Sequence, residues 1–300
     1  MKTKVAVIGA GVMGAGIAQR AATFGFCVTL VDKKDEYLKA AEKRIVESLG
    51  KMFEKGIISD DMEGGTLTLI EMTTDINAIS SSDLVIEAVN ENLELKQKIF
   101  MELDQICSSK VILATNTSSI PIASLASVTK SPQRVVGLHF MNPVPLIPLV
   151  EMIRTDQTSD ATFQACRAFL EEIGCEPVHS KDCPGFIINR ILIPMINEAV
   201  KVLESDVASA KDIDRAMVLG TKQPMGPLAL ADLIGLDTVV NILETLYAGF
   251  KDERYRPCPL LLDYVRQNKL GRKTGHGFFD YWKCPEQASP QMLVSRRLMG

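Results

Sequence analysis

The sequence predicts an α/β protein in which a mainly parallel sheet domain is followed by an all-helical domain. A glycine-rich turn near the N-terminus stands between a short apolar strand pattern and a helical pattern. Apolar strand patterns and helical patterns then alternate through the first half, and the strand signals fade after "DCPGF" at 182–186. Continuous apolar strands separated by helices are typical of a parallel sheet covered on both faces. We therefore expect a Rossmann-like first domain.

Each expected element rests on a local pattern. Short β-rich apolar runs predict seven strands, at 4–9, 27–32, 66–72, 83–89, 110–116, 134–140 and 149–153. Helical spacing predicts helices near 13–24, 36–55, 93–107 and 158–174. A further strand pattern ends at His179.

The second part reads as helical because apolar residues recur there at helical spacing, at 185–205, 210–220 and 228–250. Cys183-Pro184-Gly185 is the expected boundary, since proline and glycine stop a strand and permit a sharp turn. We expect one domain at 1–184 and the other at 185–300. The segment after about residue 282 loses periodicity, and no role is predicted for it.

Composition excludes several classes of partner. With 46% hydrophobic and 23% charged residues, the 300-residue chain has the composition of an ordinary soluble globular protein. A formal net charge of −4 gives no electrostatic basis for binding nucleic acid or an anionic membrane. The apolar runs are too short to span a bilayer. A small molecule is the expected partner.

Cysteine usage bears on metals and on the cellular compartment. The seven cysteines are scattered without a C-x-x-C pair, which argues against both a disulfide framework and a zinc site. No metal is predicted. Reduced thiols, together with an N-terminus that enters a strand pattern without a targeting signal, predict a cytoplasmic protein.

The glycine-rich turn predicts a dinucleotide site. In "VAVIGAGVMGAGIAQ", Gly9 permits a tight turn, Gly11 lets the backbone approach a pyrophosphate, and Gly14 allows close packing of helix on strand. Asp32 ends the second strand pattern 18 residues after Gly14. Its carboxylate suits the ribose hydroxyls of NAD and would repel the 2′-phosphate of NADP, so NAD is favoured.

Polar side chains at expected strand ends are candidates for chemistry, because ligands bind beyond the carboxyl ends of strands in open α/β sheets. His139 follows one strand pattern, and Glu151 lies in the next apolar run, where it must face solvent or be paired. Oxidising an alcohol with NAD needs a base, which a histidine oriented by a carboxylate can provide. A core histidine satisfied by backbone groups remains the alternative. His179 and His276 are weaker candidates.

Seven strings in order, among them "EAVNENLELK", "ATNTSSI", "RVVGLHFMNPVPLIPLVEMI" and "PMGPLALADLIGLD", resemble the 3-hydroxyacyl-CoA dehydrogenase family, and its short two-domain 3-hydroxybutyryl-CoA members in particular. The likeness runs from residue 4 to about 282. It implies a catalytic pair of His139 and Glu151, with Ser118 and Asn189 at the substrate oxygens. It also implies a homodimer, formed by a helical domain that contributes to the substrate cleft.

The same resemblance implies two sets of binding residues. The NAD contacts correspond to Gly9, Ala10, Gly11, Val12, Met13, Gly14, Asp32, Glu91, Lys96, Asn142 and Lys273. The CoA contacts correspond to Ser48, Lys51, Lys55 and Ser118. From the residues alone, the lysines of this second set would be interpreted as a solvated helix face.

The expected activity is therefore the reversible NAD-dependent oxidation of (S)-3-hydroxyacyl-CoA to 3-oxoacyl-CoA, with short acyl chains such as 3-hydroxybutyryl. One alternative is an NAD-dependent dehydrogenase of a free hydroxy acid or sugar acid, of the gulonate type. A second alternative, outside enzymes, is an NAD-binding sensor or structural protein.

Overall fold

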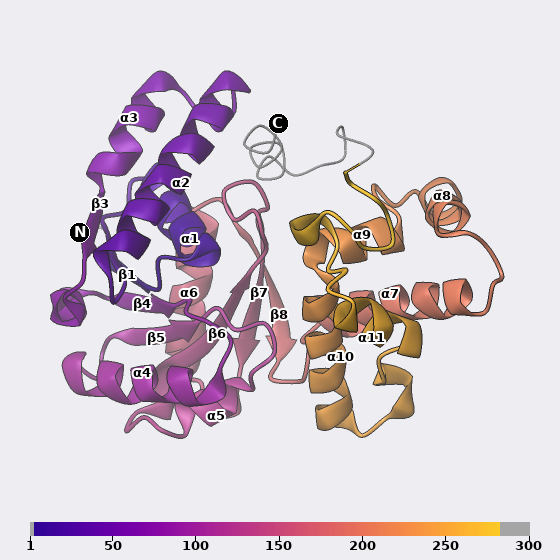
Figure 1. Ribbon diagram of the computed structural model, residues 1–300. Helices are drawn as coiled ribbons and strands as arrows, with labels where there is room; N and C mark the ends of the chain where they lie inside the picture. The colour runs from indigo at the N-terminus through magenta and orange to yellow at the C-terminus, as the bar shows by residue number, and fades with distance from the viewer. Residues whose placement is uncertain (1–2, 283–300) are drawn as a thin grey trace. The chain divides into compact units, whose positions relative to one another are not determined.

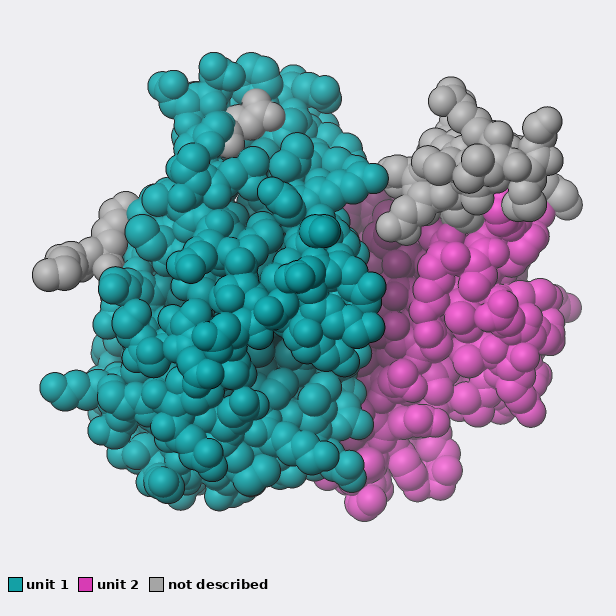
Figure 2. Space-filling view, turned by 60° about the vertical axis from the view of Figure 1, so that its left-hand side comes forward, with its two compact units in different colours: residues 1–186 teal, residues 187–300 magenta. Residues whose placement is uncertain are grey.

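The computed structural model describes residues 3–282, and the chain divides into two compact units. Unit 1 comprises residues 1–186 and unit 2 residues 187–300 (Figure 2). The division falls two residues after the boundary expected from the sequence. Within residues 3–282, no helix has the length and apolar character needed to cross a membrane.

Unit 1 is built on one eight-stranded sheet with the order β3-β2-β1-β4-β5-β6-β7-β8 (Figure 1). Every neighbouring pair is parallel except β6 and β7, which are antiparallel. The predicted mainly parallel sheet is confirmed. The strands are β1 Val5–Ile8, β2 Val28–Val31, β3 Ile70–Thr73, β4 Leu84–Glu87, β5 Ile112–Thr115, β6 Val135–Phe140, β7 Leu149–Arg154 and β8 Glu176–Lys181.

Helices cover both faces of this sheet, as the continuous apolar strands predicted (Figure 1). They are α1 Val12–Thr23, α2 Asp35–Glu54, α3 Asp60–Thr68, α4 Leu93–Ile106, α5 Ile122–Ala126 and α6 Asp160–Glu172. Because side chains alternate along a strand, Val5 and Val7 of β1 join the core under α1, α2 and α6. Ala6 and Ile8 join the opposite core, under α4 and α5.

One predicted strand is partly wrong. Residues 66–72 were expected to be extended, but Thr66 lies in the last turn of α3, and the strand includes only Ile70–Thr73. The hydroxyl of Thr66 donates to the carbonyl of Met62 at 2.6 Å, as in a helix, and the residue is buried. A short alternation of threonine and leucine fits either period, and the packing of α3 against α1 decides between them.

Unit 2 is helical, as predicted. It contains α7 Ile188–Glu204, α8 Ala210–Thr221, α9 Pro227–Ile234, α10 Leu236–Phe250 and α11 Pro259–Arg266. Its own core gathers apolar side chains from these helices, including Ile196, Leu228 and Leu243. The single helical pattern expected at 228–250 is divided at Gly235 into α9 and α10.

A buried arginine ties α1 to distant parts of unit 1. The guanidinium of Arg20 donates to the carbonyls of Ile173 at 3.0 Å and Gly174 at 2.5 Å, just before β8. It also donates to the carbonyls of Val144 at 3.1 Å and Ile147 at 3.4 Å, in the loop between β6 and β7. The charge is thus compensated by backbone oxygens, and the loop is fixed to the helix.

Replacing Arg20 by Met should therefore destabilise the protein. The change leaves several backbone carbonyls without their donor at about 1–3 kcal/mol each, so we expect the free energy of unfolding to fall by about 3–5 kcal/mol. Urea unfolding followed by circular dichroism measures this. Arg167→Met is the matched control, because Arg167 makes an exposed pair with Glu171 on α6. It should change stability by less than about 0.5 kcal/mol, and equal effects of the two changes would contradict the prediction.

Candidate active site

Gly9, Gly11 and Gly14, the three glycines of the motif that joins β1 to α1, differ in the space that a side chain would have. A side chain at Gly9, whose φ is +106°, would meet the carbonyl oxygen of Ala88 at 2.7 Å. A Cβ atom at Gly14 would lie 1.8 Å from the carbonyl oxygen of Gly9. A Cβ atom at Gly11, the N-cap of α1, would meet nothing within 4 Å. Gly9 and Gly14 are therefore required by the fold, whereas Gly11 leaves space beside the helix N-terminus.

Asp32 is held against this turn. One of its carboxylate oxygens accepts the backbone N–H of Ala10 at 2.7 Å, and the other accepts that of Lys33 at 2.7 Å. Asp32, Ala10 and Gly11 line a cavity of about 650 Å³, together with residues that follow β4. The cavity lies where the strand order reverses, between β1 and β4, which is where open α/β sheets bind nucleotides. Val12 and Met13 form the first turn of α1 beside it.

The last residue of β4, Glu87, has a buried carboxylate. Glu87 is inaccessible to solvent, and one of its oxygens accepts from the Lys96 ammonium at 2.6 Å and from the Val89 backbone N–H at 2.7 Å. The other oxygen accepts from the Thr115 hydroxyl at 2.7 Å. Lys96 was expected to contact the cofactor. The structure places its ammonium in a buried ion pair with Glu87, where it also donates to the carbonyl of Val89 at 3.2 Å. Val89 lines the cavity and Lys96 does not.

Sequence reasoning missed Glu87, although a signal was present. An acidic residue in the apolar run "DLVIEAV" raises the same question as Glu151 in "PLVEMI", namely which group compensates its charge.

Glu91 organises the turn that carries Ser118. One of its oxygens accepts hydrogen bonds from the Thr117 hydroxyl at 2.5 Å, from the Ser118 N–H at 3.0 Å, and from both the N–H and the hydroxyl of Ser119 at 2.9 Å. Burial acts to raise the pKa of Glu91, but the Lys96 ammonium and these hydrogen bonds outweigh it and lower the pKa below its usual value. An ionised Glu91 therefore fixes the backbone at Ser118.

His139 and Glu151 lie opposite each other on the antiparallel strands β6 and β7. The imidazole Nδ1 is 2.7 Å from a carboxylate oxygen of Glu151, and both side chains are buried. The contact between His139 and Glu151 that the family resemblance implied is therefore present. When Nδ1 carries the proton and donates this hydrogen bond to the carboxylate, Nε2 is the ring atom that can accept a proton from a ligand. The arrangement can serve as an oriented general base.

The remaining residues expected at the site are distributed over both units. Asn142 is exposed on the turn after β6. Asn189 lies in the first turn of α7, in unit 2. Lys273, also in unit 2, places its ammonium 2.5 and 2.6 Å from the two carboxylate oxygens of Asp237. Asn189 and Lys273 thus belong to unit 2, whereas His139 and Glu151 belong to unit 1.

A buried acid of unit 2, Asp232, anchors the segment that carries Lys273. Asp232 accepts the backbone N–H groups of Phe278 and Phe279 and the hydroxyl of Tyr281, each at 3.0 Å. Burial raises the pKa of Asp232 to about 6, although these hydrogen bonds oppose the rise.

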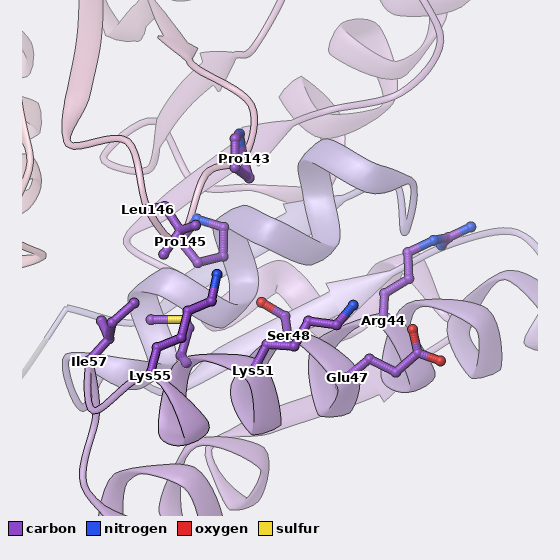
Figure 3. A pocket seen from close by; sticks show the side chains of 10 residues that line it. Arg44, Glu47, Ser48, Lys51, Lys55, Ile57, Pro143, Pro145 and Leu146 are labelled. Atoms are coloured by element: carbon purple, nitrogen blue, oxygen red, sulfur yellow. The ribbon is translucent and has the colours of Figure 1, made fainter. Parts of the chain in front are cut away.

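Helix α2 carries a row of polar side chains that lines one side of a smaller pocket of about 270 Å³ (Figure 3). Ser48, Lys51 and Lys55 recur at helical spacing and line it, with Arg44 and Glu47 beside them. Pro143, Pro145 and Leu146, from the loop between β6 and β7, form the opposite wall. The lysines expected to meet CoA thus face a pocket with one cationic and one apolar side.

Among residues 3–282, no cluster of three potential metal ligands is present.

A dinucleotide fold with an oriented histidine near the carboxyl end of a sheet strand defines the class of nicotinamide-dependent dehydrogenases. The family model of the 3-hydroxyacyl-CoA dehydrogenase NAD-binding domain matches residues 4–183, and the model of the C-terminal domain of the same family matches residues 185–281. The chain belongs to the 3-hydroxyacyl-CoA dehydrogenase family, and its cofactor is NAD.

Individual relatives agree with this assignment. The chain is 47% identical over 278 residues to a probable 3-hydroxybutyryl-CoA dehydrogenase of Bacillus subtilis, covering 93% of this chain and 97% of the relative. It is 49% identical to a probable 3-hydroxybutyryl-CoA dehydrogenase of Deinococcus radiodurans, covering 93% and 100%. The crystal structure of (S)-3-hydroxybutyryl-CoA dehydrogenase from Ralstonia eutropha superposes with a TM-score of 0.91 at 44% identity, covering 94% and 99%.

The different surroundings of Gly11 and Gly14 predict different losses. Gly11→Ala should fold normally but weaken NADH binding at least about tenfold, because its methyl group occupies the space through which a pyrophosphate approaches the backbone. Gly14→Ala should lower the free energy of unfolding by about 3 kcal/mol or more, because its methyl group overlaps the Gly9 carbonyl. Urea unfolding and NADH fluorescence titration separate the two effects.

Gly64→Ala, on α3, is the control, since a Cβ atom there meets nothing within 4 Å. It should leave NADH binding unchanged and stability equal or higher. Normal NADH affinity in Gly11→Ala would show that the open space beside this residue is not the cofactor path.

Proposed function

We propose that this protein catalyses the reversible NAD-dependent oxidation of (S)-3-hydroxyacyl-CoA to 3-oxoacyl-CoA, with His139 as the general acid and base. The hydrogen bond of 2.7 Å between His139 and Glu151 carries the proposal, because it orients an imidazole at the carboxyl end of β6 in an NAD-binding fold. The names of the Bacillus, Deinococcus and Ralstonia relatives favour short acyl chains such as 3-hydroxybutyryl.

NAD, when bound, accepts the hydride that leaves C3 of the substrate. His139 Nε2 takes the proton of the 3-hydroxyl group as the carbonyl forms, and returns it in the reverse direction. Glu151 accepts a hydrogen bond from the Nδ1–H group, which selects the tautomer and stabilises the imidazolium. Burial of both groups strengthens this interaction by excluding water.

Ser118 and Asn189 are proposed to bind the substrate oxygens. The support for Ser118 is its place in the turn fixed by Glu91, at the carboxyl end of β5 beside β6. Ser48, Lys51 and Lys55 are proposed to meet the CoA moiety, since a mobile lysine charge suits a nucleotide phosphate and all three line the α2 pocket.

We also propose a cytoplasmic homodimer. Large apolar side chains are strongly exposed on unit 2, with Ile191 at 67%, Leu219 at 68% and Val207 at 71%, and a second copy could cover them. The six cysteines among the described residues are free thiols, which fits a reducing compartment. Analytical ultracentrifugation of the purified protein tests the oligomeric state.

The assay for the proposed activity follows the loss of NADH absorbance with acetoacetyl-CoA, and with a series of longer 3-oxoacyl-CoA esters. We expect rapid turnover of acetoacetyl-CoA and none of free acetoacetate, because the α2 pocket is proposed to bind the CoA moiety. Turnover of a free hydroxy acid in preference to the thioester would instead support the gulonate-type alternative. Binding of NADH without turnover of any of these substrates would support a non-enzymatic role.

Removing the base should reduce turnover without removing the cofactor. We expect His139→Gln to lower kcat by about 10²- to 10⁴-fold while the dissociation constant of NADH stays nearly unchanged. Stopped-flow measurements of the hydride-transfer step, together with NADH titration, test this. His179→Gln is the control. His179 of β8 is paired with Met152, so its side chain lies on the opposite face of the sheet from Glu151, and it packs edge-on against Phe163 of α6. A near-normal kcat in folded His139→Gln would remove His139 from the mechanism.

A further inference from the structure

Arg44 lies on α2 where the two cavities of unit 1 meet. It lines the 650 Å³ cavity together with Gly11 and Asp32, and it also lines the 270 Å³ pocket together with Ser48. In Figure 3 its side chain extends from the end of the polar row opposite Lys55. Its guanidinium donates to the carbonyl of Ala10, in the glycine-rich turn, at 3.4 Å. One side chain thus borders both the dinucleotide turn and the polar row of α2.

Among the side chains that the structure describes, at residues 3–62 and 64–282, Arg44 forms no ion pair within 4.0 Å. The neighbouring Glu47 is paired with Lys43, at 4.0 Å. Arg44 is exposed, and its one long hydrogen bond leaves most of its five N–H donors for other acceptors.

We propose that Arg44 binds the phosphates of both nucleotides at once and thereby couples the binding of NAD(H) to that of the acyl-CoA. The proposal rests on the proposed function, which places CoA at the α2 pocket. A planar guanidinium can donate from different edges to two anionic groups, which a lysine cannot do with the same geometry. Sequence reasoning assigned no role to Arg44.

The coupling has a definite sign. Two nucleotides in adjoining cavities bring their phosphates close together, and like charges repel. A cation between them reduces this repulsion, so each ligand should bind at least as well when the other is present. By linkage, the effect of CoA on the affinity for NADH must equal the effect of NADH on the affinity for CoA.

The experiment measures the dissociation constant of NADH for the full-length protein, by NADH fluorescence, without CoA and with saturating CoA. In the unmodified protein we expect CoA to leave NADH binding unchanged or tighter. In Arg44→Met we expect CoA to weaken NADH binding about tenfold, because the repulsion is no longer compensated. Arg44→Lys should lie between the two. High salt should reduce the difference, since it screens exposed charges.

Lys43→Met is the matched control, because Lys43 precedes Arg44 on the same helix and lines neither cavity. It should behave as the unmodified protein does. If CoA has the same effect on NADH binding in Arg44→Met as in the unmodified protein, Arg44 does not couple the two sites. That result, in a protein that turns over acetoacetyl-CoA, would overturn the coupling and leave the proposed function intact. An unmodified protein that binds NADH but not CoA would overturn both.

Discussion

Carboxylates buried among apolar side chains are the constraint on which the site depends. An ionised acid that is removed from water must be paired and hydrogen-bonded, or its burial costs several kcal/mol. Unit 1 buries two such acids in its sheet, Glu87 at the end of β4 and Glu151 within β7. Each is compensated by groups on a neighbouring element, namely Lys96 and Thr115 for the first and His139 for the second. Satisfying these charges therefore fixes which elements of the site lie together.

The reversal of direction between β6 and β7 makes the second of these pairs possible. In a parallel sheet, residues that lie opposite each other belong to strands joined by a long crossover. Because β6 and β7 are antiparallel, a short loop brings Glu151 directly opposite His139. The same loop supplies Pro143, Pro145 and Leu146 to the pocket beside α2. One local change of strand direction thus supports both the proposed general base and a wall of the proposed CoA pocket.

The sequence was informative where a local pattern has a single physical explanation. The glycine-rich turn with Asp32 predicted the dinucleotide crevice, and the family motifs around His139 and Glu151 implied their contact. It was less informative where partners are distant or a pattern fits two structures. The buried pair of Glu87 with Lys96 joins a strand to a helix, and a lysine on a helix is usually solvated. Residues 66–69 fit a strand and a helix equally well, and only packing against α1 decides.

Helix α1 connects the glycine-rich turn to the loop between β6 and β7. Its N-terminus carries the glycine-rich turn, and its Arg20 holds the carbonyls of Val144 and Ile147 in the loop that borders the α2 pocket. Gly16, one helical turn before Arg20, lets the same loop approach, because a Cβ atom there would lie 3.0 Å from the Val144 side chain. A rigid helix cannot shift at one end alone. A change in how this loop packs on α1 should therefore also move the turn that is expected to bind the pyrophosphate.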